Sequence, residues 1–247
     1  MSGALLDVTG LVKRFGGLIA TNNLDLHVKR AETLALIGPN GAGKTSLIAQ
    51  LQGDLTPNAG TIRFDGRDIT REPSHRRARS GLARSFQISS VFPQFTLRDN
   101  VAVAVQAQQG HSFRFWRNAR RDRALTAPAD EMLDQVGLHR TDRLAGDVSH
   151  GERRQLELAM ALAMQPKLLL LDEPMAGMGR EDSARMTALL RQLKARYAIL
   201  LVEHDMDAVF QLADRVTVLV AGRAIATGNP DDIRRDPAVR AAYLGKR

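Results

Sequence analysis

A glycine-rich loop that ends in a lysine and a threonine is the first place where residue types and spacing could do chemistry. The loop fits G-x-x-x-x-G-K-[ST] and consists of Gly38, Pro39, Asn40, Gly41, Ala42, Gly43, Lys44 and Thr45. Glycines let such a loop turn its N–H groups inward at the positive end of a helix, where they bind phosphate. We expect Lys44 to reach the β- and γ-phosphates of a nucleotide and Thr45 to bind Mg²⁺. A chance match in a chain of this length is expected on the order of once in a hundred, so the loop predicts a nucleotide site.

An acidic pair follows a run of four leucines later in the chain. Residues 168–171 are all leucine, and Asp172 and Glu173 come directly after them. Such a run predicts a buried central strand, and ligands of open α/β sheets bind at the carboxyl ends of strands. Asp172 suits binding of Mg²⁺, directly or through water, and Glu173 suits polarising an attacking water. A solvated acidic turn is the alternative for the pair taken alone, and the phosphate-binding loop favours the catalytic interpretation.

Apolar patterns around these motifs indicate the elements that must position them. Before and after the glycine-rich loop, alternating or continuous apolar residues predict strands over residues 4–8, 24–28, 33–37 and 60–64. Helices are predicted over residues 44–52, 96–108, 129–136, 152–164, 181–194 and 206–213. The later strands are predicted over residues 168–171, 198–202, 216–220 and 223–227. Strands that alternate with helices indicate a parallel sheet covered on both faces, interrupted here by a mostly helical insert.

Composition restricts the class of protein further. The 247 residues include no cysteine, which excludes disulfides and thiolate metal sites. No secretory signal is evident at the N-terminus, and the apolar runs are far shorter than a membrane span. The net charge of +8 is dispersed apart from a denser basic run over residues 114–123. A solvated face is the favoured interpretation of that run, and contact with anionic lipid or a partner is the alternative.

Residues upstream of the acidic strand narrow the class, because they resemble the signature motif of ABC ATPases. The family consensus begins Leu-Ser-Gly-Gly-Gln, whereas residues 148–152 read Val-Ser-His-Gly-Glu. Ser149 and Gly151 are kept, and a serine hydroxyl and a glycine N–H at a helix N-terminus can bind a γ-phosphate. A simple N-cap is the alternative for Ser149, and it is compatible with this role.

Three further residues fall where this resemblance implies functional positions. Gln87, in Ala-Arg-Ser-Phe-Gln, matches the glutamine of the Q-loop, which is implied to bind Mg²⁺ and to act as a hinge. His204 matches the switch histidine that contacts the γ-phosphate, although a lone histidine there is more often ordinary loop chemistry. Phe15 falls where the family stacks an aromatic ring on adenine, and a buried core phenylalanine is the alternative. Gly179 stands in the D-loop, where Asp or Asn is usual, so cross-talk through that side chain is not expected.

The resemblance covers essentially the whole chain. It implies a P-loop NTPase (RecA-like) core with an N-terminal antiparallel β part and an inserted α-helical subdomain. Residues 1–247 would form a single ABC ATPase domain, with the core at about 1–93 and 165–247 and the helical subdomain at about 94–164. The contexts Gly-Pro-Asn-Gly, Glu-His-Asp-Met and Ala-Tyr-Leu-Gly are similar to those of ATPase subunits of bacterial branched-chain amino-acid importers and of urea or amide importers.

The same resemblance implies cofactors, partners and a location. ATP and Mg²⁺ are the expected cofactors, and two ATP molecules would lie in a head-to-tail homodimer or heterodimer of ATPase subunits. The expected partners are membrane-spanning permease subunits and, indirectly, a periplasmic substrate-binding protein, with the chain in the cytoplasm at the inner face of the bacterial cell membrane. A soluble ABC ATPase of DNA repair or translation, or the motor of a lipopolysaccharide exporter, is the alternative. Long heptad inserts or a second cassette are missing, so nucleic acid is not expected. The sequence does not identify the transported solute.

Overall fold

An antiparallel sheet forms the N-terminal part of the computed structural model, which describes residues 3–85, 91–110 and 122–244. Its strand order is β2 (Leu18–Lys29), β1 (Ala4–Phe15), β4 (Ala59–Phe64) and β5 (Arg67–Asp68). The expected antiparallel part is confirmed. β1 and β2 are longer than predicted, because they continue past the irregular register near Gly10 into a tight hairpin at Gly16.

A second sheet carries the predicted parallel strands. Its order is β10 (Arg223–Gly228), β9 (Arg215–Val220), β3 (Thr33–Ile37), β8 (Ala198–Val202), β7 (Leu168–Asp172) and β6 (Leu82–Ser85). All neighbours from β9 to β6 are parallel, and β10 is antiparallel to β9. The residues of β3 and β8 are buried throughout, as expected for strands covered on both faces.

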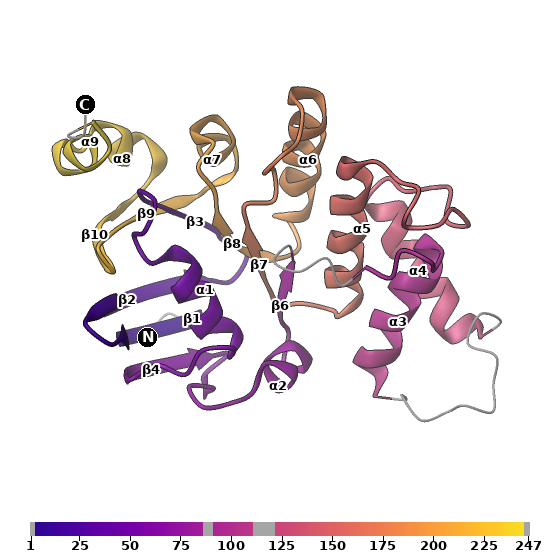
Figure 1. Cartoon of the computed structure of the whole chain (residues 1–247), viewed down its shortest axis with the longest axis horizontal. Helices are drawn as coiled ribbons and strands as arrows, with labels where there is room; N and C mark the ends of the chain where they lie inside the picture. The colour runs from indigo at the N-terminus through magenta and orange to yellow at the C-terminus, as the bar shows by residue number, and fades with distance from the viewer. Residues whose placement is uncertain (1–2, 86–90, 111–121, 245–247) are drawn as a thin grey trace.

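Helices cover both faces of this parallel sheet (Figure 1). On one face α1 (Lys44–Gln52) packs between the two sheets, and its Leu47, Ile48 and Leu51 share a buried cluster with β1, β3 and β7. On the other face lie α6 (Arg180–Leu193) and α7 (Met206–Leu212). The α/β class and the RecA-like arrangement are therefore confirmed.

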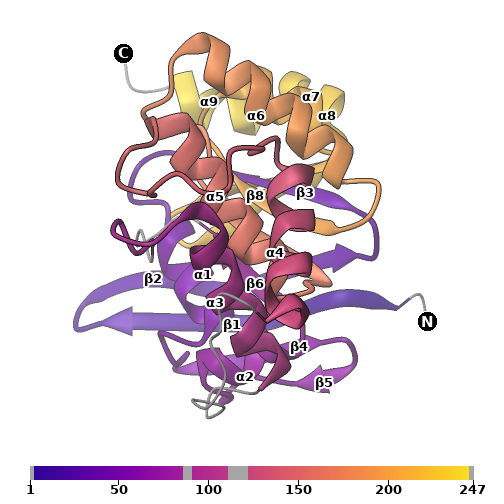
Figure 2. The ribbon, with the colours of Figure 1, turned by 90° about the vertical axis from the view of Figure 1, so that its right-hand side faces the viewer.

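Three further helices form the predicted helical insert, which faces the viewer in Figure 2. They are α3 (Leu97–Gln109), α4 (Arg123–Gln135) and α5 (His150–Ala163). α4 starts six residues before the predicted helix because it tolerates Pro128, and Asp122 caps it by accepting a hydrogen bond from Ala124 N. The buried cluster of these helices continues into β7, β8 and α6. The division into a core and a subdomain at about 94–164 stays a prediction.

Three short helices and two short strands were not predicted. They are α2 (Ser74–Arg79), α8 (Pro230–Arg235), α9 (Pro237–Leu244), β5 and β6. The helices have six to eight residues each, too few to show an apolar period. Across the described parts of the chain, no helix is both long and apolar enough to cross a membrane.

Candidate functional site

The glycine-rich loop connects the buried strand β3 to α1. A Cβ atom at Gly38 would lie 2.1 Å from the carbonyl oxygen of Leu219, and one at Gly43 would lie 2.1 Å from that of Ala20. Gly43 also has a φ of 102°, in the left-handed region. Only glycine therefore fits at these two positions, because the loop is pressed between β9 and the start of β2.

Lys44 and Thr45 are placed by the first turn of α1. Lys44 Nζ donates to the carbonyl oxygens of Gly38 at 2.7 Å and Pro39 at 3.1 Å, so its ammonium lies inside the curve of the loop. Burial lowers the pKa of Lys44, and the nearby carboxylates of Glu173 and Asp172 oppose that shift. Thr45 is exposed on the same turn. The cation and the hydroxyl at this helix N-terminus suit a phosphate chain.

The acidic pair lies where β7 ends, as predicted. Asp172 accepts a hydrogen bond from Arg84 Nη2 at 3.0 Å, and both side chains are at least nine-tenths buried. Burial raises the pKa of Asp172 because the loss of solvation outweighs the attraction of Arg84. Burial likewise lowers the pKa of Arg84.

Glu173 has a different environment from its neighbour. Its side chain is 47% exposed, so it is available to solvent and to a ligand. Its backbone φ is 52°, an unusual left-handed conformation for a residue with a side chain, and its N–H donates to Val202 O at 2.8 Å. Such strain is characteristic of functional sites, where the surrounding structure holds it in place.

His204 lies beside Glu173, at the end of the adjacent strand β8. Its Nδ1 is 4.0 Å from Glu173 Oε1 and 3.6 Å from Glu203 Oε2, and its side chain is 69% exposed. Asp205 caps α7 by accepting from Asp207 N and Ala208 N, which fixes where the loop ends. The predicted histidine and glutamate are therefore brought together at one sheet edge.

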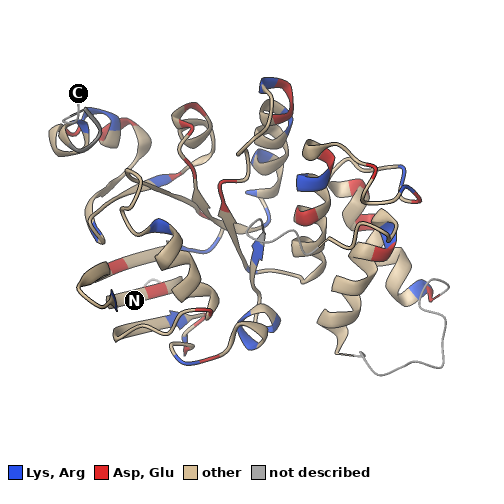
Figure 3. Cartoon of the chain, viewed as in Figure 1, with Lys and Arg blue, Asp and Glu red and all other residues tan. Residues whose placement is uncertain are grey.

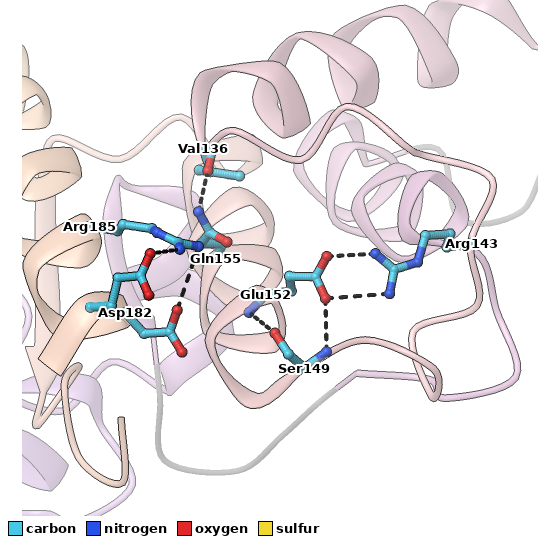
Figure 4. A network of polar contacts seen from close by, with 8 residues as sticks. Val136, Arg143, Ser149, Glu152, Gln155, Asp182 and Arg185 are labelled. Atoms are coloured by element: carbon cyan, nitrogen blue, oxygen red, sulfur yellow. Dashed lines mark hydrogen bonds and ion pairs between the residues drawn. The ribbon is translucent and has the colours of Figure 1, made fainter. Parts of the chain in front are cut away.

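Ser149 begins α5 and is held by a reciprocal capping box (Figure 4). Its hydroxyl accepts from Glu152 N at 3.2 Å, and Glu152 Oε2 accepts from Ser149 N at 2.8 Å. Arg143 Nη1 donates to Glu152 Oε1 at 2.6 Å. Burial opposes the shift, but the hydrogen bonds from Arg143 and Ser149 together hold the pKa of Glu152 below its ordinary value. The glutamate that departs from the family consensus thus stabilises the turn.

Gly151 and His150 connect this turn to the loop after Glu173 and to α6. A Cβ atom at Gly151 would lie 2.9 Å from Asp182 Cγ, so the N-termini of α5 and α6 are in close contact. His150 Nε2 lies 3.2 Å from the carbonyl oxygen of Ala176. Gly179, the D-loop glycine, is the N-cap of α6 and provides no side-chain cap.

Within one chain the two phosphate-binding candidates are separate. Figure 1 shows α1 and α5 on opposite sides of β6 and β7, so Ser149 cannot complete the site of its own glycine-rich loop. Phe15 is on the side of α1, at the tip of the β1–β2 hairpin. The residue is 46% exposed, and Lys13 Nζ lies 5.3 Å from its ring centroid. The alternative of a buried core phenylalanine is therefore wrong.

One predicted residue cannot be placed, and two contacting residues were missed. Gln87 lies outside the described residues. The sequence analysis assigns no separate role to Arg84 or Glu203. The structure buries Arg84 beside Asp172 and Glu203 beside His204. A charged residue within or directly after an apolar run is the signal that could have identified them.

Comparison with known families agrees with this geometry. The model of the ABC transporter family matches residues 21–176, which include the glycine-rich loop, Ser149, Asp172 and Glu173. A model described as branched-chain amino acid ATP-binding cassette transporter matches residues 225–247. The chain belongs to the ABC transporter family, and it is a nucleotide-binding ATPase of that family.

Individual relatives match over the full length. The chain is 37% identical to the high-affinity branched-chain amino acid transport ATP-binding protein BraF of Pseudomonas aeruginosa and 38% identical to LivG of Escherichia coli (strain K12). Each match covers 100% of both chains. A solved nucleotide-free ATP-binding cassette from an ABC transporter superposes with a TM-score of 0.87 at 26% identity, over 99% of this chain and 100% of that one.

Proposed function

We propose that this chain is the ATP-hydrolysing subunit of an importer for branched-chain amino acids or related small solutes such as urea or amides. The observation that carries the proposal is the meeting of Lys44, Asp172, Glu173 and His204 at one edge of the parallel sheet. The full-length similarity to BraF and LivG and the C-terminal match over residues 225–247 support the solute class.

The candidate residues can divide the work of binding and hydrolysis. The N–H groups of the glycine-rich loop and Lys44 bind the β- and γ-phosphates, and Phe15 stacks on adenine. Glu173 orients and polarises the attacking water, while His204 contacts the γ-phosphate. Thr45 and Asp172 supply the oxygen ligands that Mg²⁺ prefers, and Gln87 is a further ligand by resemblance. When bound, Mg²⁺ neutralises charge on the phosphates.

A second ATPase subunit completes each site in this proposal. Because Ser149 and Gly151 lie away from their own chain's phosphate loop, they bind the γ-phosphate held by a partner in a head-to-tail dimer. The partner is a second copy of this chain or a related subunit. Closure requires nucleotide, because the helix N-termini on both sides of the site carry positive partial charge that the phosphates neutralise.

Permease subunits are proposed to dock beside α3. Phe92 and Phe95 are exposed, their ring centroids are 5.1 Å apart, and Leu144 is exposed on the adjoining loop. This apolar surface follows Gln87 in the chain and suits a short permease helix. We propose that the chain lies at the inner face of the cell membrane. Figure 3 shows basic and acidic positions interspersed over the described elements.

Replacing Glu173 tests the proposed catalytic step. Glu173→Gln keeps the shape of the side chain but removes the charge that polarises water, so ATP should bind and remain unhydrolysed. We expect steady-state ATPase activity to fall at least about a hundredfold and an ATP-bound dimer to accumulate in size-exclusion chromatography. Glu181→Gln, at a well-exposed position on α6, is the matched control and should leave both measurements unchanged. Ordinary hydrolysis by Glu173→Gln would exclude the assignment.

A further inference from the structure

Glu203 is a buried glutamate to which the proposed function assigns no role. It follows the last residue of β8 and is 1% exposed. Its Oε1 accepts a hydrogen bond from Met175 N at 3.0 Å. Its Oε2 accepts from His204 N at 2.9 Å and, at a longer 3.4 Å, from Asp205 N. Within the described part of the chain, the one basic group within ion-pair distance of Glu203 is His204, whose Nδ1 lies 3.6 Å from Glu203 Oε2.

These donors belong to two different loops of the site. Met175 is in the loop after Glu173, and His204 begins the loop after β8. A buried carboxylate is costly unless several donors satisfy it, and here backbone N–H groups do so. Such groups satisfy the charge only while both loops keep their positions. The carboxylate and the loop arrangement therefore depend on each other.

We infer that Glu203 is a positioning residue that fixes the loop carrying Glu173 to the loop carrying His204. The inference rests on the proposed function, because it concerns the same two side chains. The Glu173 backbone is already tied to β8 through Val202 O. Glu203 adds a second hydrogen bond, from Met175 N, two residues further along the chain. The two hydrogen bonds together fix the turn that orients the Glu173 side chain.

The contacts continue from this turn toward the surface that would meet a partner subunit. Met175 is followed by Ala176, whose carbonyl oxygen lies 3.2 Å from His150 Nε2, and His150 is next to Ser149 at the start of α5. Glu203 thus lies between His204 on one side and the Ser149 turn on the other. A loss of the tie should affect hydrolysis more than binding, because the glycine-rich loop makes none of these contacts.

Glu203→Gln tests the inference, because the amide has the same shape but presents an NH₂ group to one of the N–H donors. We expect kcat for ATP hydrolysis to fall at least tenfold while the Kd for ATP changes less than twofold. Amide hydrogen exchange at Met175 and His204 should accelerate at least tenfold in the nucleotide-free chain. In a His204→Ala background the same substitution should lower kcat by much less, since the two residues act together.

Glu32→Gln is the matched control. Glu32 is also a buried glutamate, but it accepts from Lys29 N and Arg215 Nη1 at the start of β3, away from both loops. This variant should unfold at a lower temperature and keep its kcat. A kcat for Glu203→Gln within twofold of the wild type would overturn the inference.

A second measurement applies even where Glu203→Gln fails to fold. The wild-type amides of Met175 and His204 should be protected from exchange, and rapid exchange at both would also overturn the inference. This exchange measurement needs no nucleotide or permease. Its result is therefore independent of whether the chain serves an importer, and failure of the proposed hydrolysis at Glu173 would appear separately in the Glu173→Gln experiment.

Discussion

Two glycines of the phosphate-binding loop differ in what their surroundings allow. Gly41 has a φ of 79°, but a Cβ there would meet no atom within 4 Å. Gly43 has a φ of 102°, and its Cβ would collide with the backbone of Ala20. The first position is therefore restricted by conformation alone, and the second by conformation and by space.

Alanine at each position should separate these two effects. Gly41→Ala should lower the free energy of unfolding by about 1 kcal/mol, the cost of a left-handed residue with a side chain. Gly43→Ala should lower it by about 3 kcal/mol, because the clash with Ala20 adds to that cost. Urea denaturation of the nucleotide-free variants measures both. Equal losses at the two positions would contradict the packing seen at Gly43.

The reactive residues were more predictable than the residues that hold them. Lys44, Asp172 and Glu173 follow from short motifs, since phosphate and metal chemistry demands those types at that spacing. The burial of Arg84 against Asp172 and of Glu203 against two loops depends on contacts between distant segments. No local pattern encodes such contacts. The left-handed backbone of Glu173 is likewise visible only in the folded chain.

At the scale of elements, Arg77 connects α2 to the end of the phosphate-binding helix. Arg77 is 1% exposed, and its guanidinium donates to the carbonyl oxygens of Gln50 and Leu51 in α1. It also donates to the carbonyl oxygens of Thr70 and Glu72. A cation at a helix C-terminus satisfies orphan carbonyls and complements the helix dipole. Arg77 therefore fixes the end of α1 opposite Lys44.

Removal of the Arg77 side chain should destabilise the folded chain. Arg77→Met should lower the free energy of unfolding by about 3 kcal/mol, because several buried carbonyl oxygens lose their donors. Arg76→Met, at the exposed neighbouring position of the same helix, is the control and should change it by less than about 0.5 kcal/mol. Thermal or urea unfolding of both variants gives the comparison. A small effect at Arg77 would mean that water replaces its hydrogen bonds.

The capping box of α5 predicts a pH dependence. The folded pKa of Glu152 is below its ordinary value of 4.5, so its charge stabilises the folded chain above that pH. The stabilisation is lost as pH falls through the folded pKa. Glu152→Gln should thus be less stable than the wild type by about 1 kcal/mol at pH 7, and the difference should shrink as the pH falls below 4.5 and through the lower folded pKa. Unfolding curves from pH 7 to 3 measure it. A difference that stays constant from pH 7 to pH 3 would point to shape rather than charge.

Element prediction succeeded where a single physical pattern dominated. The bounds of β3, α1 and β8 match the prediction, because buried strands are apolar throughout and α1 begins directly after the phosphate loop. α2 was missed because its buried residue is Arg77, which breaks the rule that buried helix positions are apolar. The first turns of α4 were not predicted because Pro128 lies within the helix, whereas proline ordinarily starts or ends a helix.

At the scale of the whole molecule, a shared site predicts that two inactive variants rescue each other. Lys44→Ala disables the phosphate loop, and Ser149→Arg disables the motif that reaches the partner. Half of the dimers in an equal mixture are mixed, and each mixed dimer has one intact site of two. Activity should therefore return to about a quarter of the wild-type value. ATPase assays of each variant alone and of the mixture test this, and a mixture as inactive as its components would exclude a site shared between copies of this chain.

The buried cluster that runs from α3 through α5 into β7 and α6 limits how the molecule can move. A hinge that swung the helices away from the sheet would expose this apolar surface to water, at a cost far above that of ordinary conformational changes. Small sliding of packed side chains, or shear, leaves the surface covered. A push from the permease near Phe95 would then reach β7 through tightly packed side chains, which compress little. We therefore expect a displacement at the exposed surface around Phe95 to reach Glu173 with little loss of amplitude.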